Sequence, residues 1–213
     1  FQQDAGAQGL VSMEAEHADE NIARSGYSWA ANTTAGYSGE GALQATPLWG
    51  GGQQDAGYSQ SSPELGFQVD FVQVGTHYVW VRGIGERSSA NSIHVGLDGA
   101  EVLGTVGVDF PVSAAWQWVG GVGVVALEVS TPGVHTVNVW MRESGFIIDK
   151  VVMSTDATYV PADLGPAESP RGGGGGDTNQ APVAAAGGPY SGVAGEAIVF
   201  DGSGSSDPDG DAL

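Results

Sequence analysis

The sequence contains no cysteine and very few basic side chains. Without cysteine no disulfide can support the fold, so a bound metal becomes a candidate stabiliser. The absence of cysteine does not indicate whether the protein's compartment is oxidising or reducing. Lysine and arginine together number 6, against 25 aspartates and glutamates, and the formal net charge is −19. Because such a surface repels polyanions, we expect neither nucleic acid nor an anionic membrane as a partner.

Long hydrophobic runs and common catalytic motifs are also missing. No segment approaches the roughly 18 apolar residues that span a membrane, and residues 1–9 have no positive region and no apolar core like those of a signal peptide. We therefore expect a mature or excised piece of a secreted protein, whose acidity suits a salty, marine medium. The chain has no Gly-x-Ser-x-Gly, no His-Glu-x-x-His and no phosphate-binding loop, and its 4 histidines are isolated. We expect no catalytic residues.

Glycine, by contrast, is abundant, with 36 residues that separate short runs of valine, isoleucine, threonine and aromatics. This pattern predicts an all-β fold for residues 8–169, an antiparallel β-sandwich of jelly-roll type. Alternating apolar residues predict strands at 66–72, 75–83, 134–141 and 146–153. No helix longer than a turn or two is expected.

The composition changes near residue 169. Five consecutive glycines within 170–179 predict a flexible linker. Residues 180–213 resemble the opening third of a PKD (polycystic-kidney-disease) repeat, through Gly187-Gly-Pro-Tyr190 and Gly204-Ser-Ser-Asp-Pro-Asp-Gly-Asp211. Such repeats are immunoglobulin-like sandwiches, and their core needs roughly 80 to 100 residues. We therefore expect an incomplete immunoglobulin-like β fragment that is extended or loosely packed.

Three carboxylates near the two ends of the predicted sandwich form one candidate site. Glu14 and Glu16 share a face of an extended chain, and Asp149 interrupts an apolar run. A buried carboxylate must be paired or bound to a cation, and a hard, oxygen-binding cation such as calcium is one interpretation. The other is a solvated acidic strand edge with an ion pair to Lys150 or Arg142.

A second candidate site lies in loops that carry aromatic and polar side chains. Flat rings can cover the apolar face of a sugar, and charged or amide groups can bind its hydroxyls. The loop 141–145 offers a forked donor and a carboxylate acceptor, and the loop 86–92 adds an amide. As alternatives, the aromatic rings fill the core and the two charged groups pair with each other. The candidate carbohydrate-binding residues are Tyr27, Trp29, Trp116, Trp118, Arg142, Glu143 and Asn91.

Short motifs along the chain match one known family in their order. They are Val11-Ser-Met-Glu-Ala-Glu-His17, Tyr37-Ser-Gly-Glu-Gly41, Gly75-Thr-His-Tyr-Val-Trp-Val-Arg-Gly83, Val95-Gly-Leu-Asp-Gly99, Trp116-Gln-Trp118, Pro132-Gly-Val-His-Thr136 and Gly145-Phe-Ile-Ile-Asp149. Through these motifs residues 9–169 resemble a carbohydrate-binding module of the family 6 and family 35 group. The chain is also similar to the C-terminal sandwich of family 115 glycoside hydrolases.

The resemblance implies two sites. A structural calcium ion would be held by Glu14, Glu16 and Asp149, together with backbone carbonyls of a neighbouring loop. Many family 6 modules have an asparagine where this chain has Arg142 and Glu143, so the resemblance does not determine which sugar is bound. Arg142 could pair with a uronate or a sulfate. The implied sugar site lies among the loops at one end of the sandwich and consists of Tyr27 or Trp29, Trp116 or Trp118, and Arg142.

The prediction is a non-catalytic, calcium-stabilised polysaccharide-binding module, secreted and monomeric, which targets an attached extracellular enzyme to its glycan substrate. The alternative is an adhesion or structural module of a multidomain secreted protein, with PKD repeats as spacers. A third possibility is that the sandwich is itself a lyase or hydrolase, which predicts turnover of a polysaccharide.

Overall fold

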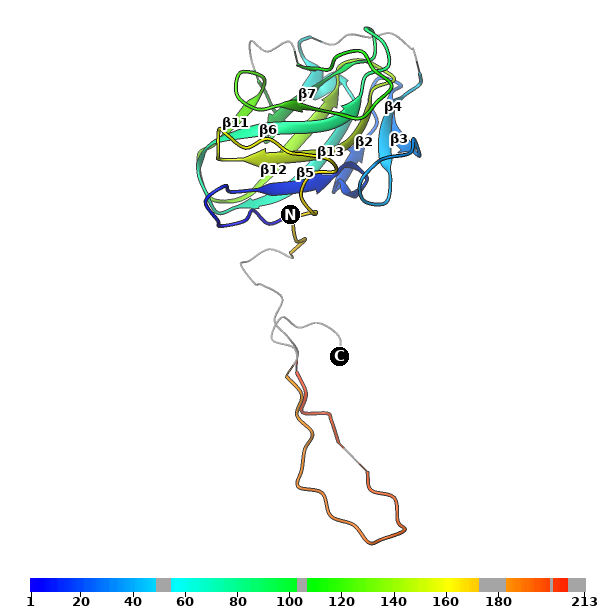
Figure 1. The fold of residues 1–213 in the computed structure, drawn as a ribbon, viewed down its shortest axis with the longest axis vertical. Helices are drawn as coiled ribbons and strands as arrows, with labels where there is room; N and C mark the ends of the chain where they lie inside the picture. Colours follow the sequence, from blue (N-terminus) through cyan, green and yellow to red (C-terminus); the bar gives the residue numbers. More distant parts are fainter. Residues whose placement is uncertain (49–54, 103–106, 173–182, 200, 207–213) are drawn as a thin grey trace. The chain divides into compact units, whose positions relative to one another are not determined.

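The chain folds into two units in a computed structural model, Phe1–Arg171 and Gly172–Leu213. In the described part of the chain, no helix is both long and apolar enough to cross a membrane. Figure 1 shows the first unit as a pair of packed sheets. The described residues are 1–48, 55–102, 107–172, 183–199 and 201–206.

The larger sheet has seven strands. They are β1 (Val11–Glu14), β3 (Ser28–Asn32), β4 (Ala42–Thr46), β6 (Gly75–Ile84), β10 (Gln117–Gly120), β11 (Ala126–Val129) and β13 (Ile147–Ser154). The strand order is β10-β6-β13-β4-β3, with β1 on β13 and β11 on β6. Because β1 pairs antiparallel with β13, Glu14 lies opposite Lys150, and the opening and closing segments of the unit lie side by side.

The second sheet has six strands. They are β2 (Glu20–Ile22), β5 (Glu64–Phe71), β7 (Ser92–Leu97), β8 (Ala100–Glu101), β9 (Val108–Asp109) and β12 (Gly133–Met141). The order is β2-β5-β12-β7-β8, with β9 on β7. Among the described residues, helical structure is limited to a 3₁₀ turn, η1 (Ala15–His17), and a short helix, α1 (Tyr58–Ser61). The predicted all-β antiparallel sandwich is confirmed.

The core lies between the two sheets and follows from the alternation in their strands. On β6, Val79 and Val81 are fully buried, whereas Tyr78 and Trp80 face the opposite side and are half-buried. Successive side chains of a strand point to opposite faces, so one apolar face of each sheet meets the other. Each fully buried valine contributes about 1.5 kcal/mol or more through loss of apolar surface to water.

Strand β13 contains a register shift at Asp149. Ile148 pairs with Gly83 and Lys150 pairs with Arg82, so Asp149 is an extra residue on its strand. A bulge of this kind re-aims side chains. Asp149 and Lys150, which would point to opposite faces of a regular strand, therefore both reach the polar network described below.

The segment 155–171, which we call the C-terminal strap, returns along the face of the larger sheet that points away from the core. The backbone N–H of Ser12 on β1 donates to Ser169 Oγ at 2.9 Å, and the backbone N–H of Ser169 donates to the carbonyl of Ser12 at 2.9 Å. Lys150 on β13 donates to the carbonyl of Leu164 at 3.1 Å. The strap is thus fixed to both terminal strands.

The second unit is described only in part. Val183 and Ser206 form an isolated antiparallel bridge, and the backbone N–H of Asp201 donates to the hydroxyl of Tyr190 at 2.8 Å. The predicted linker, 170–179, and the predicted PKD fragment, 180–213, both include residues outside the described ranges. Residues 1–7 belong to the first unit: the Phe1 ring packs on Phe67 with ring centroids 6.1 Å apart.

Candidate functional site

Three of the predicted sugar-binding residues come together where β12 connects to β13. Arg142 Nη1 donates to Ser92 Oγ at 2.7 Å. Glu143 Oε2 accepts from Ser92 Oγ at 2.8 Å and from the backbone N–H of Asn91 at 3.0 Å. The hydroxyl of Ser92, at the start of β7, therefore links the two charged side chains.

Two exposed carboxylates complete this group. Arg142 Nε donates to Asp55 Oδ1 at 2.9 Å, and Arg142 Nη1 lies 3.5 Å from Asp109 Oδ1. The side chain of Arg142 is only 4% exposed, against 62% for Asp55 and 53% for Asp109. A fixed guanidinium thus lies beneath two carboxylates that face solvent. We call Asp55, Asn91, Ser92, Asp109, Arg142 and Glu143 the Arg142 cluster.

The aromatic residues that were predicted to join Arg142 lie elsewhere. Trp29 is 4% exposed, belongs to the core and donates its indole N–H to the carbonyl of Pro63 at 3.3 Å. A buried ring cannot stack on a sugar, so its assignment to the sugar site is corrected. Tyr27 is half-buried against the same core, next to a turn in which its carbonyl accepts from the backbone N–H of Arg24.

The two tryptophans of the Trp-x-Trp segment lie on the larger sheet. Trp116 donates to the carbonyl of Ala35 at 2.9 Å, and its ring centroid is 5.0 Å from the guanidinium carbon of Arg82. Trp118 donates to the carbonyl of Asp163, in the C-terminal strap, at 3.1 Å. Within the described ranges, these hydrogen bonds and ring contacts do not reach the Arg142 cluster. The structure therefore divides the predicted sugar-site residues among separate places.

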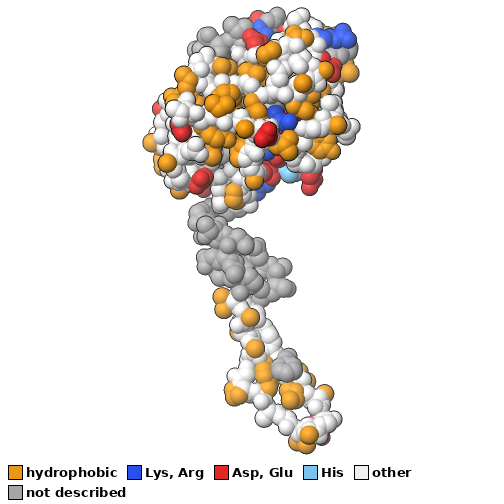
Figure 2. Space-filling view, viewed as in Figure 1, with side chains coloured by type: hydrophobic (Ala, Val, Ile, Leu, Met, Phe, Trp, Pro, Cys, Tyr) orange, Lys and Arg blue, Asp and Glu red, His pale blue; other side chains and the backbone are white. Residues whose placement is uncertain are grey.

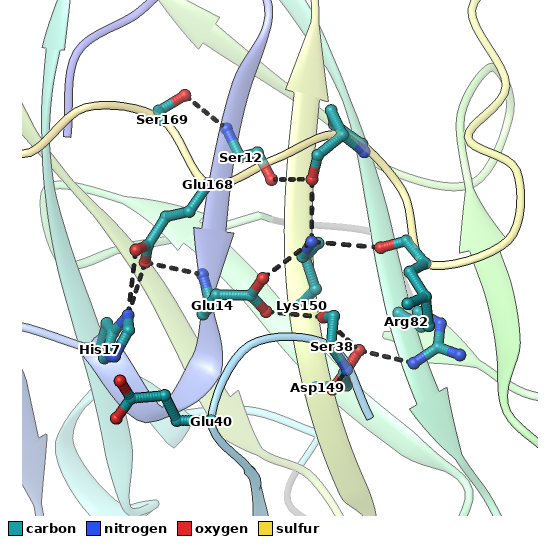
Figure 3. A network of polar contacts seen from close by, with 12 residues as sticks. Ser12, Glu14, His17, Ser38, Glu40, Arg82, Asp149, Lys150, Glu168 and Ser169 are labelled. Carbon is teal, nitrogen blue, oxygen red and sulfur yellow. Dashed lines mark hydrogen bonds and ion pairs between the residues drawn. The ribbon is translucent and has the colours of Figure 1, made fainter. Parts of the chain in front are cut away.

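Two of the three predicted metal-ligating residues, Glu14 and Asp149, form part of a second polar group, shown in Figure 3. Glu14 Oε1 lies 2.8 Å from Lys150 Nζ, and Glu14 Oε2 lies 2.7 Å from Ser38 Oγ. Asp149 Oδ1 accepts from the backbone N–H of Ser38 at 2.8 Å. Asp149 Oδ2 lies 2.9 Å from Ser38 Oγ and 2.7 Å from Arg82 Nη1. We call Glu14, Ser38, Arg82, Asp149 and Lys150 the Lys150 network.

The third predicted ligand, Glu16, lies beside this network on η1. Its Oε1 accepts from the backbone N–H groups of Glu40 at 2.7 Å and Gly41 at 3.0 Å. Its Oε2 is buried and has no hydrogen-bond partner among the described residues. Burial raises the pKa of Glu14, against the opposing effect of the hydrogen bonds from Lys150 and Ser38.

This arrangement does not fit a calcium ion. Calcium takes about six to eight oxygen ligands, but all four carboxylate oxygens of Glu14 and Asp149 already contact a donor. Among the described residues, no group of three or more aspartate, glutamate or histidine side chains is arranged so that it could hold one metal ion. Glu16 adds a single unpartnered oxygen. The calcium prediction finds no support in these contacts.

Sequence reasoning missed two members of the Lys150 network. One interpretation of the sequence gave an ion pair with Lys150 or Arg142, whereas the cationic side chain that contacts Asp149 among the described residues is Arg82. Arg82 was placed correctly on a strand, but the sequence does not state that this strand pairs with β13. Ser38, which links two carboxylates, belongs to the motif Tyr37-Ser-Gly-Glu-Gly41, but the sequence assigned no role to its side chain.

The architecture and the position of the Arg142 cluster define the first unit as an antiparallel β-sandwich module with a polar cluster among its loops. Residues 5–168 match the sequence model of the glycosyl hydrolase family 115 C-terminal domain. The chain belongs to this family.

Matches to individual proteins are weaker than the family match, in coverage or in sequence identity. The chain is 33% identical over 113 residues to uncharacterized protein P23 of Formosa agariphila, which covers 48% of this chain and 27% of that protein. The chain therefore spans about a quarter of the length that this curated relative has. A GH26-CBM35 β-(1,4)-mannanase of Podospora anserina is similar, with 21% identity, a TM-score of 0.49, and coverage of 74% of this chain and 30% of that one. A family 35 carbohydrate-binding module from an environmental isolate has 15% identity, a TM-score of 0.49, and coverage of 75% and 98%.

Proposed function

We propose that the first unit is a non-catalytic sugar-binding module that holds an attached extracellular enzyme on its polysaccharide substrate. The observation that carries this proposal is the family match over residues 5–168, because the matching family is the C-terminal domain of glycosyl hydrolases. Binding without turnover still raises the rate of an attached enzyme, because it increases the effective concentration of the substrate.

The Arg142 cluster is the proposed binding site. Its exposed carboxylates, Asp55 and Asp109, can accept hydrogen bonds from sugar hydroxyls, and charged acceptors make stronger hydrogen bonds than neutral ones. The buried guanidinium of Arg142 holds both carboxylates in place, which lowers the entropy lost when a sugar binds. Ser92 and Glu143 fix that guanidinium in turn.

The charges of the cluster favour a neutral glycan. Its three carboxylates, on Asp55, Asp109 and Glu143, face one guanidinium, so its formal charge is 1 − 3 = −2. A uronate or sulfate would meet carboxylates that Arg142 does not fully compensate, whereas hydroxyl groups would meet ready acceptors. The structure thus weighs against an acidic sugar paired with Arg142. On the face of the molecule in Figure 2, Lys and Arg side chains are sparse, which fits the same preference.

Affinity electrophoresis and calorimetry with neutral, uronate-containing and sulfated polysaccharides test this proposal. We expect the full chain to bind one or more neutral glycans, and Asp109→Asn to weaken that binding by about tenfold, which equals about 1.4 kcal/mol. Glu128→Gln is the matched control, because it removes one exposed negative charge on β11 and should leave binding unchanged. No binding to any glycan in the panel, or the appearance of new reducing ends or unsaturated products, would contradict the proposal.

A further inference from the structure

We infer that two side chains of the protein itself, Lys150 and Arg82, supply the cations that join the first and last strands, and that the first unit is stable without a bound metal. This inference departs from the calcium ion that the family resemblance implies. It does not depend on the proposed sugar-binding function.

Lys150 is the only lysine in the sequence. The residue is 2% exposed, and its Nζ lies 2.8 Å from Glu14 Oε1, 3.1 Å from the carbonyl of Leu164 and 2.8 Å from the carbonyl of Pro166. An ammonium has three donor hydrogens, so these three acceptors satisfy it completely. One cation therefore connects β1, β13 and the C-terminal strap.

Arg82 provides the second cation. Its Nη1 donates to Asp149 Oδ2 at 2.7 Å, and its Nη2 donates to the carbonyl of Gly36 at 3.0 Å. The ring of Trp116 covers the guanidinium at 5.0 Å from its centroid. Planar guanidinium groups suit this combination of a carboxylate, a carbonyl and an aromatic face. Asp149, which is fully buried, is thereby compensated without a metal.

The charges of the Lys150 network sum to zero before any ion binds. Glu14 and Asp149 are negative, Lys150 and Arg82 are positive, and Ser38 links the two carboxylates. A calcium ion bound by these carboxylates would displace both cations from their partners. Two buried positive groups would then lie unpaired beside a divalent ion, and an unpaired buried charge is strongly destabilising.

The bulge at Asp149 makes this arrangement possible. Because Asp149 is the extra residue between Ile148 and Lys150, a carboxylate and an ammonium that are adjacent in sequence reach the same network. The β1 to β13 pairing places Glu14 opposite Lys150 on the neighbouring strand. The register of the sheet therefore places the ammonium of Lys150 beside the carboxylate of Glu14.

The wild-type chain gives the first test. Its thermal midpoint should be the same, within error, in excess chelator and in millimolar calcium, and elemental analysis of the purified chain should find no stoichiometric metal. A lower midpoint in chelator, a higher midpoint in calcium or one bound calcium per chain would overturn the inference. This test needs no variant, so it stands even if a substitution prevents folding.

Lys150→Met gives the second test, because it keeps the aliphatic part of the side chain and removes the charge. We expect a thermal midpoint lower by about 10 °C, since one partner of a buried pair is lost, and faster proteolysis within the strap. Arg87→Met, which removes an exposed cation, is the control for the change in net charge and should shift the midpoint little.

The double variant Glu14→Gln with Lys150→Met tests whether the two side chains act as a pair. It should lose less thermal stability than the sum of the two single losses, because contacting residues couple energetically. Additive losses would show that Lys150 does not serve as the cation for Glu14. A Lys150→Met midpoint equal to that of the wild type would overturn the inference directly.

Discussion

The indole N–H of Trp118 donates a hydrogen bond of 3.1 Å to the backbone carbonyl of Asp163. The same ring lies against Gly165, where a Cβ atom would approach Trp118 Cζ2 to 2.6 Å. The φ of Gly165 is +78°, which other residues rarely adopt, so the strap can pass this closely over the ring only at a glycine. Trp118 on β10 therefore holds the C-terminal strap on the sheet.

Trp118→Ala should reduce stability and leave glycan binding intact. Loss of the ring and of its hydrogen bond to Asp163 is expected to lower the free energy of unfolding by about 3 kcal/mol, measured by urea unfolding. Trp118→Phe, which keeps a ring and loses the N–H donor, should lower it by about 1 kcal/mol. Unchanged stability combined with weaker glycan binding would contradict this prediction and would assign Trp118 to the sugar site.

Trp29→Ala should be one of the most destabilising substitutions in the first unit. The ring fills the core, so truncation is expected to cost about 4 kcal/mol. Trp29→Phe keeps a ring but removes the hydrogen bond to Pro63 and part of the ring volume, and it should cost about 2 kcal/mol. Both losses are measured by chemical unfolding. A variant that folds with wild-type stability but binds less glycan would contradict the core assignment.

Much of the fold could be predicted because alternation determines which side chains are buried. The predicted strand at 75–83 corresponds to β6, and its valines face the core as the pattern indicates. The predicted strands at 66–72 and 134–141 correspond to β5 and β12, which pair with each other. A period of two is a local property, and the residues of one strand are enough to reveal it.

The contacts of the candidate sites depended on information that is not local. The sequence did not show that Trp118 would lie under the strap or that Arg82 would face Asp149, because both contacts depend on strand order and on the bulge in β13. Arg142 and Glu143 were found from sequence because they are adjacent in one loop. Asp55, which lies outside the strands, and Asp109, at the end of β9, join them from distant parts of the chain and were not found.

Ser38→Ala should destabilise the protein because the Ser38 hydroxyl links two buried carboxylates. Its Oγ lies 2.7 Å from Glu14 Oε2 and 2.9 Å from Asp149 Oδ2. The hydroxyl carries one hydrogen, and Asp149 Oδ2 also accepts from Arg82 Nη1, so the substitution takes from Glu14 Oε2 the donor that it depends on. The loss is expected to cost about 2 kcal/mol in urea unfolding. Ser88→Ala, at an exposed position, is the control and should cost less than about 0.5 kcal/mol. Equal effects of the two substitutions would argue against the link.

The pair His135 and Asp98 should make stability depend on pH. His135 Nδ1 lies 2.7 Å from Asp98 Oδ2, and this hydrogen bond raises the pKa of His135. A histidine whose pKa is higher in the folded state contributes stability that is fully present below its unfolded pKa of about 6.5 and is lost as the pH rises through the folded pKa. The thermal midpoint of the wild type should therefore exceed that of His135→Gln most at about pH 5.5, and the difference should shrink as the pH rises toward about 9. The difference between the two proteins cancels the titration of the other histidines, and a difference that stays constant with pH would contradict the expected linkage.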